Sequence, residues 1–100
     1  MKKPISVGVV GCGYWGPNLI RNFSGLPNCK VKMVCDSLEN RLVHLANIYP
    51  GLETTRNFDQ MLERDDIEAI VVATPVSTHF EMAKKSLLAG KHTLIDFTFH

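Results

Sequence analysis

The fold is decided by one stretch near the amino terminus, Val7-Gly8-Val9-Val10-Gly11-Cys12-Gly13-Tyr14-Trp15-Gly16-Pro17. The apolar run from Ile5 to Val10 is typical of a strand buried on both faces, and Pro17 suits the first turn of a helix. Between them lies a GxGxxG pattern. Gly11 permits a tight turn, Gly13 lets the backbone approach a pyrophosphate, and Gly16 lets the helix pack closely on the strand. The stretch therefore predicts a strand–turn–helix unit whose free N–H groups and helix dipole face a phosphate.

The rest of the chain alternates between strand and helix patterns. Further strands are predicted at Val31–Cys35, Glu53–Thr55, Ile70–Ala73 and Thr93–Phe97. The first helix ends at Gly25–Asn28. Ser37 is expected to cap a second helix, which runs through Leu38, Leu42, Leu45 and Ile48. A short third helix is expected to be capped by Asn57 or Asp59. After a loop at Thr74–Thr78, a fourth runs from Phe80 to Ala89, with Phe80, Ala83, Leu87 and Leu88 as its apolar positions and Gly90 as its C-terminal cap. This order predicts an α/β fold with a doubly wound parallel sheet, the Rossmann fold, with strand order 3-2-1-4-5 in a single domain over residues 1–100.

A carboxylate at the end of the second strand completes a cofactor site. Asp36 lies 20 residues after Gly16, where a carboxylate accepts hydrogen bonds from the adenosine ribose hydroxyls. It would repel a 2′-phosphate, so the sequence favours NAD over NADP, and Arg41 softens that preference. The other residues assigned to the dinucleotide site are Tyr14, Trp15, Ser37, Ala73, Thr74, Pro75, Thr78 and His79. Other roles stay open: Asp36 as a helix cap, Arg41 as a solvated helix residue, and Thr78 and His79 as caps of the fourth helix.

Composition excludes several classes of protein. Hydrophobic residues make up 45% and charged residues 21%, and the net charge of +1 gives no electrostatic case for binding nucleic acid or a membrane. No apolar run is long enough to cross a bilayer. The three cysteines form no CxxC pair, so no metal site is predicted, and reduced thiols in a cytoplasmic protein are the simpler interpretation.

Three motifs in the correct order resemble one known family. They are Val7 to Asn18, then Ala73-Thr74-Pro75 with Thr78-His79, then Leu88-Ala89-Gly90-Lys91-His92. They resemble the glucose-fructose oxidoreductase, inositol dehydrogenase and rhizopine-catabolism (Gfo/Idh/MocA) family over residues 5 to about 92. The Gly-Tyr-Trp-Gly-Pro-Asn form of the loop is most similar to members acting on nucleotide sugars, such as 3-dehydrogenases of the UDP-N-acetylglucosamine type. The resemblance implies an NAD(P)-dependent enzyme that moves a hydride between a sugar or polyol carbon and the nicotinamide.

The same resemblance shows what this chain lacks. In the family a Glu-Lys-Pro segment follows the fifth strand, and its lysine acts near the reacting hydroxyl; Phe97 stands there and cannot transfer a proton. The catalytic residues are therefore unknown. Either the chain is divergent or truncated at residue 100, or an internal deletion near residues 92–94 joined the sixth strand to His92. The deletion is favoured because Thr93 to His100 matches that later strand.

Two functional hypotheses follow. The first is the cofactor-binding domain of an oxidoreductase acting on a sugar, polyol or nucleotide-sugar hydroxyl. It would be catalytically incomplete until the family's second domain supplies the substrate pocket. The second is a non-catalytic NAD-binding or interaction module that forms a homo-oligomer, with Phe97 and Phe99 as an exposed apolar patch.

Overall fold

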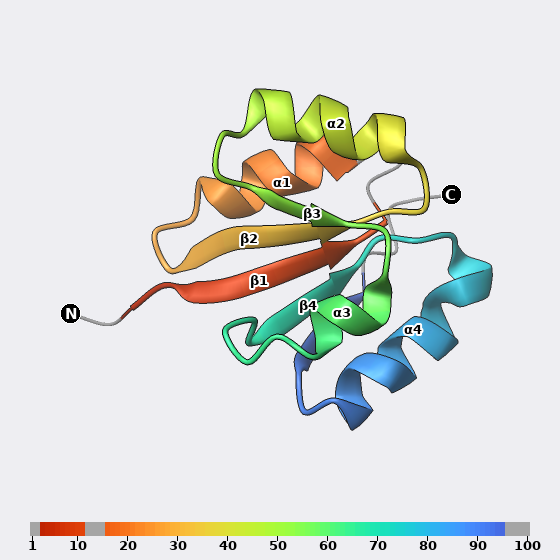
Figure 1. The fold of residues 1–100 in the computed structure, drawn as a ribbon. Helices are drawn as coiled ribbons and strands as arrows, with labels where there is room; N and C mark the ends of the chain where they lie inside the picture. The colour runs from red at the N-terminus through yellow and green to blue at the C-terminus, as the bar shows by residue number, and fades with distance from the viewer. Residues whose placement is uncertain (1–2, 12–15, 96–100) are drawn as a thin grey trace.

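In the computed structural model of the chain, which describes residues 3–11 and 16–95, a parallel sheet carries helices on both faces (Figure 1). The sheet order is β3-β2-β1-β4-β5, which confirms the predicted 3-2-1-4-5 arrangement. In chain order the elements are β1 (Ile5–Val10), α1 (Gly16–Ser24), β2 (Cys29–Cys35), α2 (Glu39–Ile48), β3 (Glu53–Thr55), α3 (Phe58–Leu62), β4 (Ala69–Val72), α4 (Val76–Leu88) and β5 (His92–Ile95).

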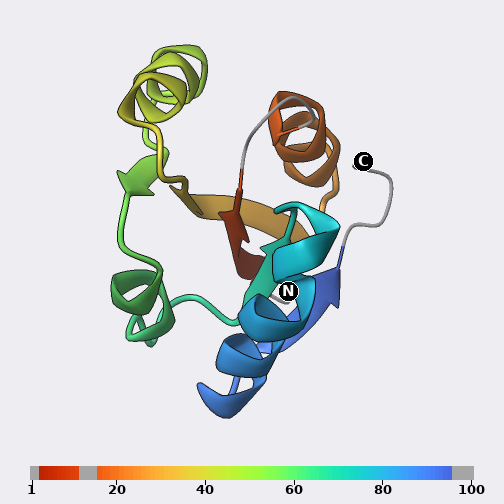
Figure 2. The same cartoon turned by 90° about the vertical axis from the view of Figure 1, so that its right-hand side faces the viewer.

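Each face of the sheet buries its own apolar cluster. Helices α1 and α2 cover one face, and α3 and α4 the other (Figures 1 and 2). On the first face, Ile20 of α1 and Leu42 and Leu45 of α2 pack against Val9 and Val34. The second cluster joins the other side of the sheet to α3 and, at its margin, to α4; its members are Val10, Met33, Cys35, Phe58, Met61, Ile67, Ile70 and Val72, with Leu62, Met82 and Ile95 packed against it. The near-continuous apolar runs of β1 and β4 reflect this burial on both sides.

The pairing register brings four strand ends to one edge of the sheet. Val10 of β1 pairs with Cys35 of β2 and with Val72 of β4, and Cys35 in turn pairs with Thr55 of β3. The β1–β2 register shifts between Val7 and Gly8, and this irregularity does not disturb the pairing at the carboxyl ends. The residues that follow these strands therefore meet at the edge where ligands bind in doubly wound sheets.

Two helix starts were predicted wrongly. Helix α4 begins at Val76, whereas the sequence predicted a loop through Thr78 and a helix from Phe80. Pro75 fixes a non-helical conformation just ahead of the first turn, and the chain turns helical directly after it. Ser37 does not cap α2: the N-cap residue is Leu38, which makes no side-chain cap bond.

The remaining differences are small. Asn57 caps α3 by accepting from the Gln60 N–H at 3.3 Å, which settles the open choice with Asp59. Gly90 has φ +79° directly after the C-cap Ala89, as predicted. Strands β2 and β4 begin at Cys29 and Ala69, slightly earlier than expected, and β5 is described as His92–Ile95. Phe97 and Phe99 lie outside the described residues.

The apolar stripe of α4 faces away from the sheet. Phe80, Leu87 and Leu88 are 79%, 62% and 78% exposed. The positions of α4 that are buried are His79 and Ser86, and the Ser86 hydroxyl donates to the Met82 carbonyl at 2.9 Å. The helix therefore contacts the sheet through Met82 and the buried His79 and Ser86, and not through its largest exposed apolar residues.

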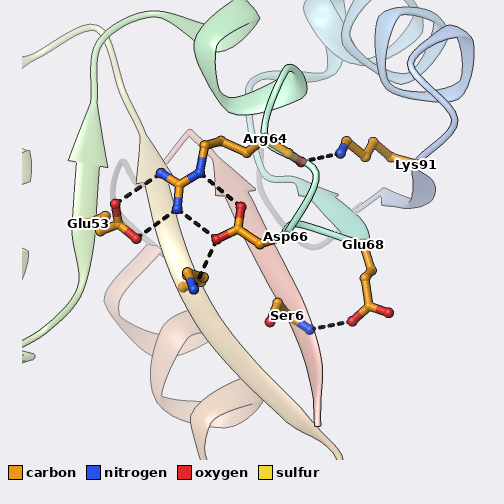
Figure 3. Close-up of polar contacts among 7 residues, drawn as sticks. Ser6, Glu53, Arg64, Asp66, Glu68 and Lys91 are labelled. Atoms are coloured by element: carbon orange, nitrogen blue, oxygen red, sulfur yellow. Dashed lines mark hydrogen bonds and ion pairs between the residues drawn. The ribbon is translucent and has the colours of Figure 1, made fainter. Parts of the chain in front are cut away.

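A polar network fixes the amino-terminal side of the sheet (Figure 3). The Arg64 guanidinium donates two bonds to Glu53, at 3.0 and 3.1 Å, and two to Asp66, at 2.9 and 2.8 Å. Lys32 also pairs with Asp66, at 3.0 Å. Farther along, the Lys91 ammonium donates to the carbonyls of Arg64 and Ile67 at 2.6 and 2.7 Å. These contacts hold the α3–β4 connection against the strands and lie apart from the carboxyl ends.

Candidate functional site

A cavity of about 480 Å³ opens at the carboxyl ends of β1, β2 and β4. Its lining combines apolar side chains with three charged ones, Asp36, Arg41 and Arg56. The complete lining is Val10, Gly11, Cys35, Asp36, Ser37, Arg41, Arg56, Phe58, Ala73, Thr74, Pro75 and Met82. A concave, largely apolar site with a few polar groups suits a small molecule with a planar ring and hydroxyls.

Gly11 sits where no larger residue fits. Its φ is +84°, and a Cβ built on it would lie 2.7 Å from Thr74 Cγ2 and 2.9 Å from the Thr74 nitrogen. Its N–H donates to the Cys35 carbonyl at 2.7 Å. The chain leaving β1 is thus pressed between the ends of β2 and β4. Only glycine allows this close approach of β1 to the β4–α4 loop.

Asp36 places a buried carboxylate at the mouth of the cavity. The residue is 6% exposed. Its Oδ1 accepts from the Leu38 N–H at 2.8 Å, and its Oδ2 lies 3.7 Å from Arg41 Nη1. The bond to Leu38 steadies the turn ahead of α2, and the Asp36 side chain also lines the cavity. Asp36 thus lies in the cavity lining, whereas its alternative role as a side-chain cap of α2 is wrong, because α2 has no side-chain cap bond.

Arg56 is a lining residue that the sequence did not single out. Its Nε donates to the Ser37 carbonyl at 3.2 Å, so the end of β3 is tied to the turn that follows Asp36. The Asp36 N–H also donates to the Thr55 carbonyl at 3.2 Å. Asp36 and Arg56 each follow one member of the Cys35–Thr55 pair, and this register is what brings them side by side. The sequence does not show that Arg56 lies near Asp36, because the two residues are far apart along the chain, and this is why Arg56 was missed.

The loop between β4 and α4 is braced by its own side chains. The Thr78 hydroxyl is within hydrogen-bond distance of Thr74 Oγ1 at 2.7 Å and of the Pro75 carbonyl at 2.8 Å. His79 Nε2 lies 2.7 Å from the Thr74 carbonyl, and the ring is 5% exposed. Thr78 and His79 therefore stand behind the loop and fix Thr74 and Pro75, which line the cavity.

Cys35 contributes a neutral thiol to the wall. Burial, with a smaller contribution from the adjacent Asp36 charge, raises the pKa of this thiol to about 11. A thiol protonated at neutral pH is a poor nucleophile. The side chain therefore serves as apolar lining.

The cavity brings together seven of the predicted site residues, namely Gly11, Asp36, Ser37, Arg41, Ala73, Thr74 and Pro75. Gly16 begins α1, as the glycine pattern predicted. Gly13, Tyr14 and Trp15 lie outside the described residues. Besides Arg56, prediction missed the apolar lining residues Val10, Cys35, Phe58 and Met82, whose patterns in the sequence are those of ordinary core positions.

Within residues 3–11 and 16–95, no three His, Cys, Asp or Glu side chains converge as metal ligands would. None of the helices in that part of the chain is long and apolar enough to span a membrane.

A dinucleotide fits these residues. Gly11 forms the tight turn directly after β1 that a dinucleotide loop requires, and the buried Asp36 offers the acceptor that a ribose diol needs. In agreement, residues 5–97 match the oxidoreductase family with an NAD-binding Rossmann fold. The chain belongs to this family.

Relatives of this oxidoreductase family are considerably longer. A glycosyl hydrolase family 109 protein from Streptomyces niveus is 30% identical over 104 residues, a match that spans 95% of this chain and 21% of the relative. An uncharacterised oxidoreductase from Bacillus subtilis is 30% identical over 92 residues, spanning 92% of this chain and 27% of the relative. The chain thus covers about a fifth to a quarter of these relatives' lengths.

Solved members of the oxidoreductase family have the same fold. A 3-ketoreductase from Actinomadura kijaniata, in complex with NADP and TDP-benzene, superposes with a TM-score of 0.88 at 29% identity, covering 96% of this chain and 30% of the enzyme. The scyllo-inositol dehydrogenase from Lactobacillus casei, with bound NAD(H) and scyllo-inositol, superposes with a TM-score of 0.86 at 26% identity. That match covers 93% of this chain and 28% of the dehydrogenase. These two enzymes hold different dinucleotides, so the fold is common to NAD and NADP users.

Proposed function

We propose that this chain is the dinucleotide-binding part of an oxidoreductase that acts on a sugar, polyol or nucleotide-sugar hydroxyl. The observation that carries the proposal is the convergence of Gly11, Asp36 and the Thr74–Pro75 loop on one cavity at the carboxyl edge of the sheet. In this proposal the backbone at Gly11, Gly13 and Gly16 takes the pyrophosphate. Tyr14 and Trp15 belong to the same loop.

Asp36 and Ser37 take the adenosine ribose, and the apolar lining takes the adenine ring. Arg41 stands beside the ribose site. Ala73, Thr74 and Pro75 form the opposite wall, with Thr78 and His79 bracing it. The Asp36 carboxylate prefers a ribose 2′-hydroxyl, so NAD is the expected cofactor, with NADP binding less tightly.

The cofactor, when bound, supplies hydride acceptor and donor chemistry at its nicotinamide ring. In this proposal the cavity holds the adenosine part of the cofactor, and the glycine loop that follows β1 holds the pyrophosphate. The ketoreductase and the inositol dehydrogenase, both similar to this chain, support a sugar or polyol substrate for the whole protein. Phe97 stands at the family's lysine position and cannot move a proton, so residues 1–100 are expected to bind cofactor without turnover.

Titration of the purified chain with NADH, following Trp15 fluorescence, tests this function. Trp15 is the single tryptophan and lies within the glycine pattern, so bound dinucleotide should change its emission. Saturable binding is expected, and Gly11→Ala should abolish it. Absence of binding by a chain shown to be folded would overturn the assignment.

Self-association is the second candidate function, and one observation favours it. Phe80, Leu87 and Leu88 form an exposed apolar stripe along α4 that a second copy of the chain could cover about a two-fold axis. Sedimentation equilibrium of the wild type and of Leu88→Gln measures it. A concentration-dependent dimer that Leu88→Gln dissociates supports the contact, and a monomer at all concentrations refutes it.

A further inference from the structure

We infer that Arg56, acting with Arg41, is a specificity-determining residue that lets this site accept a 2′-phosphorylated adenosine ribose, and hence NADP as well as NAD. The inference rests on the proposed dinucleotide site. It assigns a role to Arg56 that comes from the tertiary structure and not from the sequence pattern.

The first argument is position. Arg56 follows β3 where Asp36 follows β2, and these strands pair through Cys35 and Thr55. The Arg56 Nε bond to the Ser37 carbonyl, at 3.2 Å, holds the guanidinium against the residue next to Asp36. A phosphate on the 2′-oxygen of a ribose bound by Asp36 would project from the place where Asp36, Ser37 and Arg56 meet.

The second argument is donor capacity. A guanidinium carries five N–H donors, and the bond to Ser37 uses the one on Nε. The contacts among the described residues give the terminal Nη groups of Arg56 no other partner. Two such groups in a planar fork match the oxygens of a phosphate.

The third argument is charge. The acidic and basic residues that line the cavity are one carboxylate, Asp36, and two guanidiniums, Arg41 and Arg56. Asp36 is already bonded to the Leu38 N–H at 2.8 Å and lies 3.7 Å from Arg41 Nη1. A 2′-phosphate therefore meets a locally positive surface in which the carboxylate is largely balanced.

Arg41 can turn toward this phosphate from the other side. Its side chain is 46% exposed, and its contact with Asp36 at 3.7 Å is a loose ion pair and not a close hydrogen bond. Arg41 lies in α2 and Arg56 directly follows β3, so the two flank the turn between β2 and α2. Together they would form a clamp that a 2′-hydroxyl does not need.

Binding measurements on matched variants test the inference. Dissociation constants for NADH and NADPH are measured by calorimetry for the wild type, Arg56→Ala, Arg56→Lys, Arg41→Ala and the control Arg21→Ala. The control removes the same charge from exposed Arg21 of α1, which is not among the cavity-lining residues. Circular dichroism confirms that each variant is folded. The fragments 2′-AMP and 5′-AMP serve as competitors that differ only in the position of the phosphate.

The wild type is expected to bind NADPH within about tenfold of NADH. Arg56→Ala and Arg41→Ala should each weaken NADPH binding by about tenfold or more, which is the range for the loss of a charge-assisted bond. The affinity for NADH should not change. Arg56→Lys should give an intermediate loss, and 2′-AMP should compete better than 5′-AMP only where both arginines are present. Arg21→Ala should match the wild type.

The failures are distinguishable. If NADH binds but NADPH does not, or if Arg56→Ala weakens both cofactors equally, the role of Arg56 is refuted and the dinucleotide site stands. If neither cofactor binds to the folded wild type, the proposed function itself fails.

Discussion

Replacing Gly11 with alanine tests whether the β1 turn is shaped for close approach or only for a left-handed backbone. Two separate penalties apply at this position. The backbone has φ +84°, which disfavours any Cβ by about 1–2 kcal/mol. The added methyl would also lie 2.7 Å from Thr74 Cγ2, 2.9 Å from the Thr74 nitrogen and 3.0 Å from the Ala73 carbonyl carbon. Two of these three atoms are backbone, so relief requires the β4–α4 loop to move, at about 1–3 kcal/mol.

Gly51 supplies the matched control. Its φ is +91°, and a Cβ there would meet nothing within 4 Å. Gly51→Ala therefore carries the backbone penalty alone, and both variants share the same gain from a less flexible unfolded chain. The free energy of unfolding of Gly11→Ala should fall below that of Gly51→Ala by about 1–3 kcal/mol. Each kcal/mol lowers the Tm of a domain of this size by roughly 4–8 °C.

The assay is urea unfolding followed by circular dichroism, combined with NADH titration. Gly51→Ala should bind NADH as the wild type does, because Gly51 lies outside the cavity lining. Gly11→Ala should lose binding even where it is folded, because the loop that moves carries Thr74 and Pro75. Equal destabilisation by the two substitutions, or normal NADH affinity in folded Gly11→Ala, would show that the close approach at Gly11 has no such role.

Three further perturbations have expected outcomes. Lys91→Met removes two charge-assisted bonds to carbonyls of the α3–β4 connection and should lower the free energy of unfolding by about 2–3 kcal/mol. The same change at exposed Lys84 should leave the free energy of unfolding nearly unchanged. Equal effects of the two substitutions would contradict the role of Lys91. The Arg64 guanidinium holds the pKa of the Asp66 carboxyl well below its usual range. This pair therefore stabilises the fold above about pH 4, which is the pKa of the carboxyl in the unfolded chain. The stabilisation is lost as the pH falls through the lower pKa of the folded state. Acid titration of wild type and Arg64→Gln, followed by circular dichroism, should show the stability difference shrinking toward low pH and high salt, and a pH-independent difference would argue against the pairing. Burial raises the pKa of the Cys35 thiol to about 11. Alkylation of Cys35, quantified by mass spectrometry of its peptide, should therefore stay slow at pH 8 and accelerate only near pH 11. Rapid labelling at pH 8 would contradict a buried neutral thiol.

The sequence predicted well wherever the information is local. Strand β1 and the helix starting at Gly16 follow from an apolar run, three glycines and a proline. Gly90 was predicted as a cap and Asn57 as one of two candidates, because a cap acts within a few residues of itself. The strand order also followed, because alternation of strand and helix leaves few topologies that obey right-handed crossover.

The failures come from competition between local groups or from missing context. Ser37 is a good capping residue, but α2 begins one residue too late for it, with Leu38 at the N-cap and the Leu38 N–H bonded to the Asp36 carboxylate. Phe80, Leu87 and Leu88 have helical spacing typical of a buried face, yet all three are exposed. Periodicity shows that a helix has an apolar side, but it does not show which neighbour covers that side.

The sequence alone determined the order of the elements, the glycine turn and the carboxylate that follows β2, because each is set by residues close together in the chain. Only the tertiary structure decided what surrounds that carboxylate. Arg56 directly follows β3, 20 residues after Asp36, and it reaches the Ser37 carbonyl because Cys35 and Thr55 pair in the sheet. Sheet register joins residues by their position across strands and not along the chain, so which charges meet a bound ribose is fixed only when the strands assemble.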